Sequence, residues 1–416
     1  MKYLISILFL SAITTVFGQQ YIHGVVVDTD SGEPVPLANV VLKGTYKGTA
    51  TNFGGEFFIN ITEDHLKDTL IISVVGYKTL QLSVPDYLSE EFHRIKLKPF
   101  VFEMNDVTIE TKSLLYNTMI KNASEGIAKN YYQGPLNYDL YYRNTQKENN
   151  KVSKERQAAV RLYDSKGYEQ SGTFQVYKER GYDFLQVRRS FELNSLTDGS
   201  TQLDDLLEFD VVRHRANVLN PDYIYDDYDV DLLKITEVDG DSVYVLKFEC
   251  KNPGLSNSGD NYVKAYKGKV YIKKKDNAII KYEGEYECSN YSSLGRSLYV
   301  NEAQQNYSPM SITYKVTTRY KEFNGKYFLS SIAYERNHKW KHKQNRAIRT
   351  ESVNAELLVT EIELKNVQEI PNRAYYEEVE FDKEFWSSFN YLRDEKAETP
   401  NRQKGNGNRG KGKSKR

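Results

Sequence analysis

The sequence predicts an all-β-dominated protein: a small N-terminal β-sandwich, one helix, a long antiparallel sheet and a disordered basic C-terminal tail. The 416 residues include 34 tyrosines and 18 phenylalanines, which favour strands together with Val, Ile and Thr. Short runs of alternating apolar and polar residues are separated by Gly, Pro, Asn and Asp. In a single stretch of the chain, apolar residues recur with the 3.6-residue period of a helix. At roughly 100–200 residues per domain, this length allows two or three domains.

Residues 1–18 have the three zones of a signal peptide. Lys2 is followed by an apolar run over 4–10, and the small Gly18 suits the cleavage site. No later run approaches the 18 apolar residues that a membrane helix requires, so we expect no transmembrane segment in the mature chain. We expect the protein to be exported and to lie in the periplasm or at the outer membrane. Secretion is the less favoured alternative.

Residues 20–98 predict the sandwich, since about seven short strands fit into some 80 residues. Ile22, Gly24 and Val26 alternate with more polar positions at the start. Turn residues then separate the further strands expected at 39–43, 56–61, 69–75, 78–84 and 94–97.

This region resembles the carboxypeptidase-like regulatory domain, a transthyretin-like β-sandwich common in gram-negative envelope proteins. The residues that carry the resemblance are IHGVVVD (22–28), GEPVPLANV (32–40), KGT (43–45), GTATN (48–52), GGEF (54–57) and SVVGY (73–77). Asn52 stands where the family usually has Asp, and either residue suits a turn. None of the six histidines is followed by Glu at the spacing of a zinc peptidase. We therefore expect no enzyme activity, no catalytic residue, no metal and no cofactor.

After a linker over 99–112, one helix is expected over 113–130. Leu115, Met119, Ile120, Ala123 and Ile127 keep a rough period of 3.6 residues. Leu115, Met119, Ala123 and Ile127 would line any apolar cavity between the helix and the sheet.

The remaining chain to 392 reads as an antiparallel sheet. Asp239-Gly240, Asp276-Asn277 and Asn324-Gly325 are hairpin turns between apolar runs. Ile312, Tyr314, Val316 and Tyr320 share one face of a strand, whereas Lys315, Thr317 and Arg319 share the other, as in a sheet with one packed face.

This second region resembles a lipoprotein-carrier half-barrel, an antiparallel sheet curled around a helix. The segments that carry the resemblance are AKNYYQGP (128–135), YYR (141–143), VYVLKF (243–248) and GKVYI (268–272). The resemblance implies that a lipid or lipoprotein acyl chain could be the ligand.

Cys250 and Cys288 are not expected to form a disulfide. They fall on strands two apart in a predicted meander, about 9.5 Å from each other, whereas disulfides need Cα atoms within about 7 Å. Buried free thiols are the expectation.

A basic and aromatic segment could contact an anionic surface such as lipid headgroups. Its residues are Arg336, His338, Lys339, Trp340, Lys341, His342, Lys343 and Arg346. The alternative is a solvated hairpin loop, and two histidines without a third ligand do not hold zinc.

Basic and acidic residues balance at 57 each, and residues 395–416 form a basic Gly- and Asn-rich tail, so the folded part is acidic and nucleic-acid binding is not expected. The function expected is that of a non-catalytic, exported cell-envelope protein acting as an interaction or scaffold module. Two alternatives stay open: a periplasmic carrier of a lipid or acyl chain, and a hydrolase or peptidase accessory. The partner would be an envelope protein or a lipid, and the oligomeric state is left open.

Overall fold

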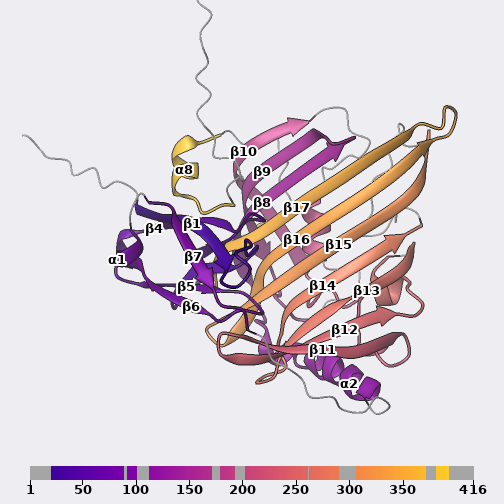
Figure 1. Ribbon diagram of the computed structural model, residues 1–416, viewed down its shortest axis with the longest axis horizontal. Coiled ribbons are helices and arrows are strands. Elements are labelled where there is room, and N and C mark those ends of the chain that lie inside the picture. Colours follow the sequence, from indigo (N-terminus) through magenta and orange to yellow (C-terminus); the bar gives the residue numbers. More distant parts are fainter. Residues whose placement is uncertain are drawn as a thin grey trace, which may run out of the picture.

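The protein consists of a small β-sandwich packed against one large, strongly twisted sheet (Figure 1). The computed structural model describes residues 20–88, 91–100, 112–170, 179–192, 202–260, 262–289, 306–371 and 381–392. The expected signal peptide, the basic tail and residues 101–111 of the linker lie outside these residues.

The sandwich has a three-stranded sheet of order β4-β1-β7 and a four-stranded sheet of order β3-β2-β5-β6. Its elements are β1 (Gln20–Asp28), β2 (Asn39–Leu42), β3 (Gly48–Ala50), β4 (Glu56–Ile61), η1 (Glu63–His65), β5 (Thr69–Ser73), β6 (Leu80–Ser83), α1 (Val84–Tyr87) and β7 (His93–Leu97). The expected strands are present, and their observed ends differ from the predicted ones by up to two residues.

Alternation along β1 explains the sandwich core. Ile22 and Val26 are fully buried and pack between the two sheets with Ile59 and Ile72. Gly24 is required where β1 pairs in parallel with β7, because a Cβ at this position would lie 2.1 Å from a backbone oxygen of that strand.

The large sheet has ten antiparallel strands in the order β10-β9-β8-β17-β16-β15-β14-β13-β12-β11. They are β8 (Leu136–Glu148), β9 (Lys151–Asp164), β10 (Arg180–Glu192), β11 (Tyr228–Val238), β12 (Asp241–Cys250), β13 (Val263–Lys273), β14 (Ile279–Cys288), β15 (Tyr307–Phe323), β16 (Lys326–His342) and β17 (Ile348–Glu363). The sheet is curled and open between β10 and β11, so the all-β-dominated half-barrel expectation is confirmed.

The predicted hairpin turns lie where the sequence placed them. Asp239 and Gly240 have φ values of 50° and 82°, and Asn324 and Gly325 have 50° and 74°. Asn and Asp tolerate this left-handed region and Gly enters it without strain. A further turn of the same kind, Asn149-Asn150, joins β8 to β9.

Helices cover the two faces of the large sheet unequally. The helical segments are α2 (Lys112–Glu125), α3 (Ile127–Asn130), α5 (Gln202–Glu208), α6 (Leu255–Ser258) and α8 (Lys383–Ser388). The concave face carries the main core, which includes α2, α3 and α5 residues. On the convex face, Trp386 of α8 packs with Tyr141, and the sandwich lies beside it (Figure 1). The predicted helix over 113–130 is thus α2 and α3, interrupted at Gly126.

Cys250 and Cys288 end β12 and β14, with β13 between them; neither forms a disulfide, and both are buried. Burial raises the pKa of Cys250 to about 11. Among the described helices, none has both the length and the apolar character needed to cross a membrane.

Candidate functional site: the sheet interior and the interdomain cleft

Helix α2 presents most of the expected face to the interior, with Leu115 as the exception. Tyr116, Ile120 and Ala123 are buried, as is Ile127 at the start of α3. Leu115 is 57% exposed and lines no interior space, which corrects the expectation for this residue.

Polar contacts set the rotation of the helix. Asn117 donates from Nδ2 to the backbone oxygens of Ile224 and Tyr228. This turns Leu115 outward, whereas Met119 stays partly buried at the edge of the core.

The chain itself occupies the concave face beside α2. Residues 202–228, here called the inner segment, lie beside the helix on this face, with α5 against β16 and β17 and α2 against β11 and β13. Phe209 stacks on Tyr334 of β16 with ring centroids 5.1 Å apart. Ser124 of α2 donates to the backbone oxygen of Leu219 at 2.5 Å. The inner segment also buries apolar side chains completely or nearly so: Leu206, Val211, Val212, Val218, Leu219 and Ile224.

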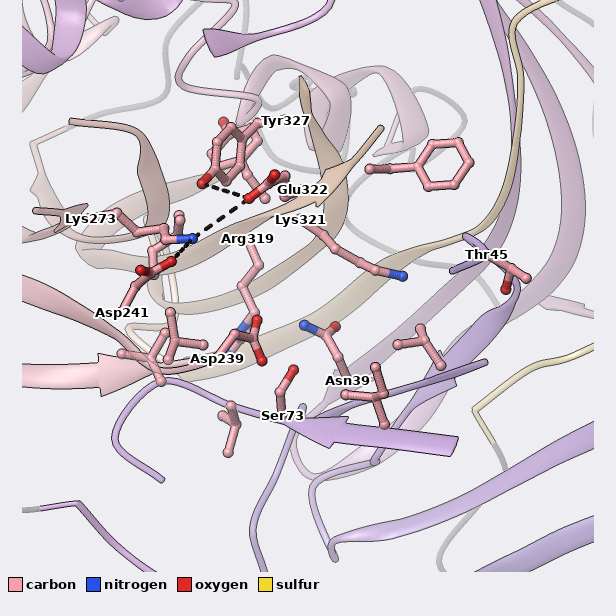
Figure 2. A pocket seen from close by; sticks show the side chains of 18 of the residues that line it. Asn39, Thr45, Ser73, Asp239, Asp241, Lys273, Arg319, Lys321, Glu322 and Tyr327 are labelled. Atoms are coloured by element: carbon pink, nitrogen blue, oxygen red, sulfur yellow. Dashed lines mark hydrogen bonds and ion pairs between the residues drawn. The ribbon is translucent and has the colours of Figure 1, made fainter. Parts of the chain in front are cut away.

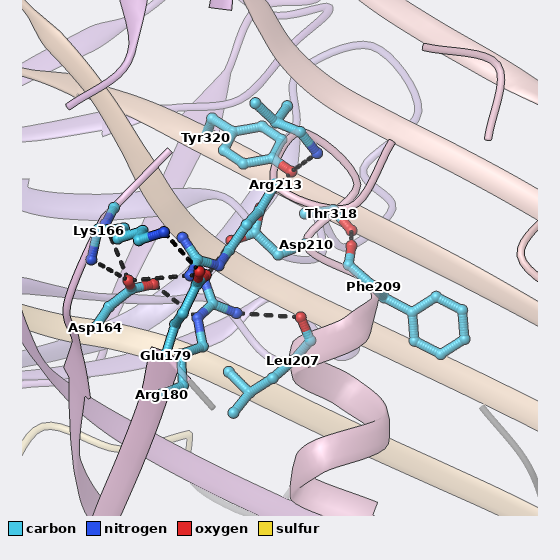
Figure 3. A network of polar contacts seen from close by, with 12 residues as sticks. Asp164, Lys166, Glu179, Arg180, Leu207, Phe209, Asp210, Arg213, Thr318 and Tyr320 are labelled. Atoms are coloured by element: carbon cyan, nitrogen blue, oxygen red, sulfur yellow. Dashed lines mark hydrogen bonds and ion pairs between the residues drawn. The ribbon is translucent and has the colours of Figure 1, made fainter. Parts of the chain in front are cut away.

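A buried ionic network anchors the inner segment to β9 and β10 (Figure 3). Nε of Arg180 lies 2.8 Å from Oδ2 of Asp164, and its Nη2 lies 2.9 Å from Oδ2 of Asp210. Nη2 of Arg213 lies 2.8 Å from Oε2 of Glu179. Burial opposes the charge of Arg180, but the two aspartates outweigh it and hold the pKa of Arg180 above its ordinary value. Charges buried this deeply require such pairing.

The predicted basic patch does not form one surface. Arg336, His338 and Trp340 are at most 2% exposed, on the same side of β16 as Tyr334. Lys339 points the other way and is exposed. The reason is the two-residue alternation of a strand, since β16 continues to His342 where a loop was one of the expectations. The remaining residues of the set, Lys341, His342, Lys343 and Arg346, lie around the exposed end of this hairpin.

His338 belongs to a buried polar group and not to a surface. Its Nδ1 lies 3.4 Å from Oε1 of Glu351, which also contacts Nη2 of Arg336 at 3.1 Å. Burial lowers the pKa of His338 to about 4. Within the described residues, no three His, Cys, Asp or Glu side chains are arranged to hold a metal ion.

A cleft of about 390 Å³ lies between the sandwich and the convex face of the large sheet (Figure 2). Residues of β2 and β5 form one wall, including Asn39, Ile71 and Ser73. Residues of β13 and β15 form the facing wall, including Lys273 and Arg319. The two domains therefore share one concave site to which both contribute polar side chains.

Direct contacts hold the two walls together. The hydroxyl of Tyr46 donates to the backbone oxygen of Leu329, and the Tyr46 ring meets Phe323 edge to face. Oγ1 of Thr79 donates to Oδ1 of Asp239 at 2.7 Å. The cleft is thus bordered by contacts that fix the sandwich on the sheet.

Sequence reasoning did not identify the residues of this cleft or of the ionic network. Arg319 was placed on the correct face of its strand, but that face was expected to meet water. Asp210 and Arg213 flank the apolar pair Val211-Val212, and a charge on each side of a buried run is the signal that could have marked the network.

A family comparison identifies the N-terminal domain. Residues 22–109 match the family model described as CarboxypepD_reg-like domain, which confirms the resemblance stated for the sandwich. The TonB-dependent receptor SusC of Bacteroides thetaiotaomicron is 44% identical over 69 residues. These residues are 16% of this chain, and the chain spans 6% of the length of that relative.

Two solved structures are similar over longer stretches. A DUF1329 family protein from Desulfovibrio piger is 11% identical, with 60% of this chain and 93% of that chain covered and a TM-score of 0.24. A Bacteroides fragilis protein of unknown function, described as membrane-associated, is 9% identical, with 83% and 100% covered and a TM-score of 0.16. Scores this low define no shared fold.

Proposed function

Given that the chain carries a CarboxypepD_reg-like domain at residues 22–109, we propose that the protein is a non-catalytic, exported cell-envelope protein that acts as an interaction or scaffold module. The signal-peptide pattern of residues 1–18 supports export. The likeness of the sandwich to part of a TonB-dependent receptor supports a place in the envelope, in the periplasm or at the outer membrane.

The close packing of side chains on the concave face of the large sheet is the observation that favours a scaffold over a carrier. A carrier of an acyl chain needs an apolar cavity of at least about 300 Å³. Here α2 packs directly on β11 and β13, α5 of the inner segment packs on β16 and β17, and the side chains of the inner segment belong to the same core as Ile120 and Ala123. The ionic network around Arg180 secures that segment. A scaffold requires this kind of solid packing.

The state of the buried nucleophiles supports a non-catalytic role. Cys250 is buried and its pKa is raised to about 11, so little thiolate is present near neutral pH. The buried carboxylates of Asp164 and Asp210 are engaged by arginines. These groups serve the packing of the inner segment.

Purification from the native envelope tests the proposal. Protein isolated under mild conditions is extracted with organic solvent for lipid mass spectrometry, and a cross-linked sample is digested for protein identification. The matched control is the same protein after unfolding in guanidinium and refolding without lipid. We expect reproducible protein cross-links and lipid far below one molecule per chain, equal in both samples. About one lipid per chain in the native sample alone would support the carrier, and recovery in the cytosolic fraction would contradict export.

A further inference from the structure

Two cations in the interdomain cleft each have a buried donor atom without a hydrogen-bond acceptor among the described residues. Arg319 and Lys321 are two residues apart on β15 and lie on its convex face. Within the described residues, Nη1 of Arg319 and Nζ of Lys321 are shielded from solvent and have no hydrogen-bond acceptor. Burying a charged donor without an acceptor is costly, and such a group is a candidate for an external partner.

The neighbouring acids are already engaged elsewhere. Oδ2 of Asp241 lies 2.6 Å from Nζ of Lys273, and Oε2 of Glu322 accepts from the Tyr327 hydroxyl at 3.3 Å. Asp239 is at an exposed turn and is bonded to Thr79 at 2.7 Å.

Glu283 is the acid that most favours the charge of Arg319. It lies 2.6 Å from Nζ of Lys281 and 3.0 Å from Nζ of Lys269. Nη1 of Arg319 and Nζ of Lys321 thus remain available as hydrogen-bond donors to a ligand.

The opposite wall adds a neutral donor. Asn39 accepts through Oδ1 from the Ser330 hydroxyl at 3.2 Å, which leaves its amide nitrogen turned into the cleft, near Ser73 (Figure 2). Lys321 reaches across from the sheet, with Nζ 4.4 Å from the centre of the Tyr46 ring. The donors therefore come from both domains.

Apart from Thr45 and Asn324, the remaining lining of the cleft is largely apolar. Val41, Ile71 and Val75 contribute from the sandwich, and Ile280 and Phe323 from the sheet. A volume of about 390 Å³ is at the lower end of the range for small-molecule sites. A ligand that satisfies the whole cleft has one anionic end and a short apolar body.

We propose that this cleft binds a small organic anion, with Arg319 and Lys321 holding its carboxylate or phosphate head group and the apolar lining holding its body. Arg319 supplies a planar donor set that suits either head group. Asn39 donates from the opposite wall. The site is separate from the sheet interior, so it does not depend on the scaffold role proposed above.

Protonation of Lys321 should make anion binding depend on pH. Burial lowers the pKa of Lys321 to about 7, against the weaker attraction of Asp239. The other charged or titratable groups that line the cleft are Arg319, Tyr320 and Glu322 on β15, Lys273 on β13, Asp241 on β12 and Tyr327 on β16, and the ring of Tyr46 lies beside Lys321. A bound anion favours the protonated amine, so binding takes up a proton and is stronger at pH 6 than at pH 9.

Isothermal titration calorimetry of the full chain tests the proposal with four probes: hexanoate, hexyl phosphate, inorganic phosphate and hexanol. We expect one site for hexanoate or hexyl phosphate, with the tighter of the two identifying the head group. Binding should weaken at least tenfold from pH 6 to pH 9. Failure of both amphiphilic anions to bind would overturn the proposal. Equal binding of hexanol or of inorganic phosphate would overturn it too, since the head group and the body are both required.

Two variants separate binding from folding. Lys321→Met replaces a buried unpartnered amine by an apolar side chain of similar length, so the melting temperature should not fall, while affinity should drop at least tenfold. Lys315→Met is the matched control, because Lys315 is exposed on the same face of the same strand. Unchanged affinity in Lys321→Met, or an equal loss in Lys315→Met, would contradict the assignment.

Discussion

The hydroxyl of Tyr320, on the concave face of β15, donates a 2.8 Å hydrogen bond to Oδ1 of Asp210 in the inner segment. The same hydroxyl accepts from the backbone N–H of Val212 at 3.1 Å. One side chain of the sheet thus secures both a charged group and a backbone donor of the segment that fills the interior, as Figure 3 shows.

Removing this hydroxyl should destabilise the protein. Tyr320→Phe leaves the Val212 N–H without its acceptor and removes a hydrogen bond to a carboxylate, so we expect the free energy of unfolding to fall by about 1.5–3 kcal/mol. Urea denaturation measures this change. Tyr262→Phe is the control, because Tyr262 is 38% exposed, and its effect should stay within about 0.5 kcal/mol. Equal stability of the two variants would mean that Tyr320 does not anchor the inner segment.

The two faces of α2 should respond differently to truncation. Ile120 is fully buried, whereas Leu115 is 57% exposed. Ile120→Ala should lower the free energy of unfolding by about 2–5 kcal/mol, and Leu115→Ala should change it by less than about 0.5 kcal/mol. Chemical denaturation of both variants gives the comparison. A larger cost at Leu115 would contradict the outward position of this side chain.

His338 should make the protein sensitive to mild acid. Burial lowers the pKa of His338 from 6.5 to about 4. The unfolded chain therefore takes up a proton between about pH 6.5 and 4 that the folded chain does not bind. Stability falls as the pH falls through this window, by about 3 kcal/mol in total.

Urea midpoints measured from pH 7 to 4 test this dependence. In His338→Gln the loss within that window should be smaller, whereas His342→Gln should keep the wild-type profile. The pKa of Glu351 is about 2 because His338 and Arg336 outweigh the effect of burial. The stability that this carboxylate contributes is therefore lost only below about pH 4.5. An unchanged profile in His338→Gln would contradict the assignment.

Trp340 should not respond to lipid surfaces. Trp340 and Trp386 are the two tryptophans of the chain, and both are at most 5% exposed. In Trp386→Phe the emission reports Trp340, and it should be blue-shifted, weakly quenched by iodide and unchanged by anionic phosphatidylglycerol vesicles. Neutral phosphatidylcholine vesicles are the control. A spectral shift with anionic vesicles alone would support the headgroup contact considered from the sequence.

Local patterns were sufficient to predict the strands of the sandwich and several strands and turns of the large sheet, but not β8, β9 and β10. The alternation of Ile312, Tyr314 and Val316 identified the packed face of β15, and the left-handed turn at Asn324-Gly325 followed from its residue types. These features depend on a few neighbouring residues, which is why one sequence reveals them.

Features that depend on distant segments were not predicted. Arg319 and Lys321 are on the face expected to meet water, and the sandwich covers that face in the folded protein. Trp340 was grouped with its basic neighbours because sequence proximity does not show which residues of a continuing strand point inward. The partners of Asp210 come from β10 and β15, far away in the chain.

Hydrogen–deuterium exchange of the inner segment tests the central claim most directly, since a filled interior and a lid over a ligand cavity differ in how often this segment opens. In the full chain, peptides covering 209–219 should exchange as slowly as those from β15, and adding palmitate should change neither. Rapid exchange of 209–219 that slows when palmitate is added would contradict the scaffold account and identify the segment as a lid over a lipid site.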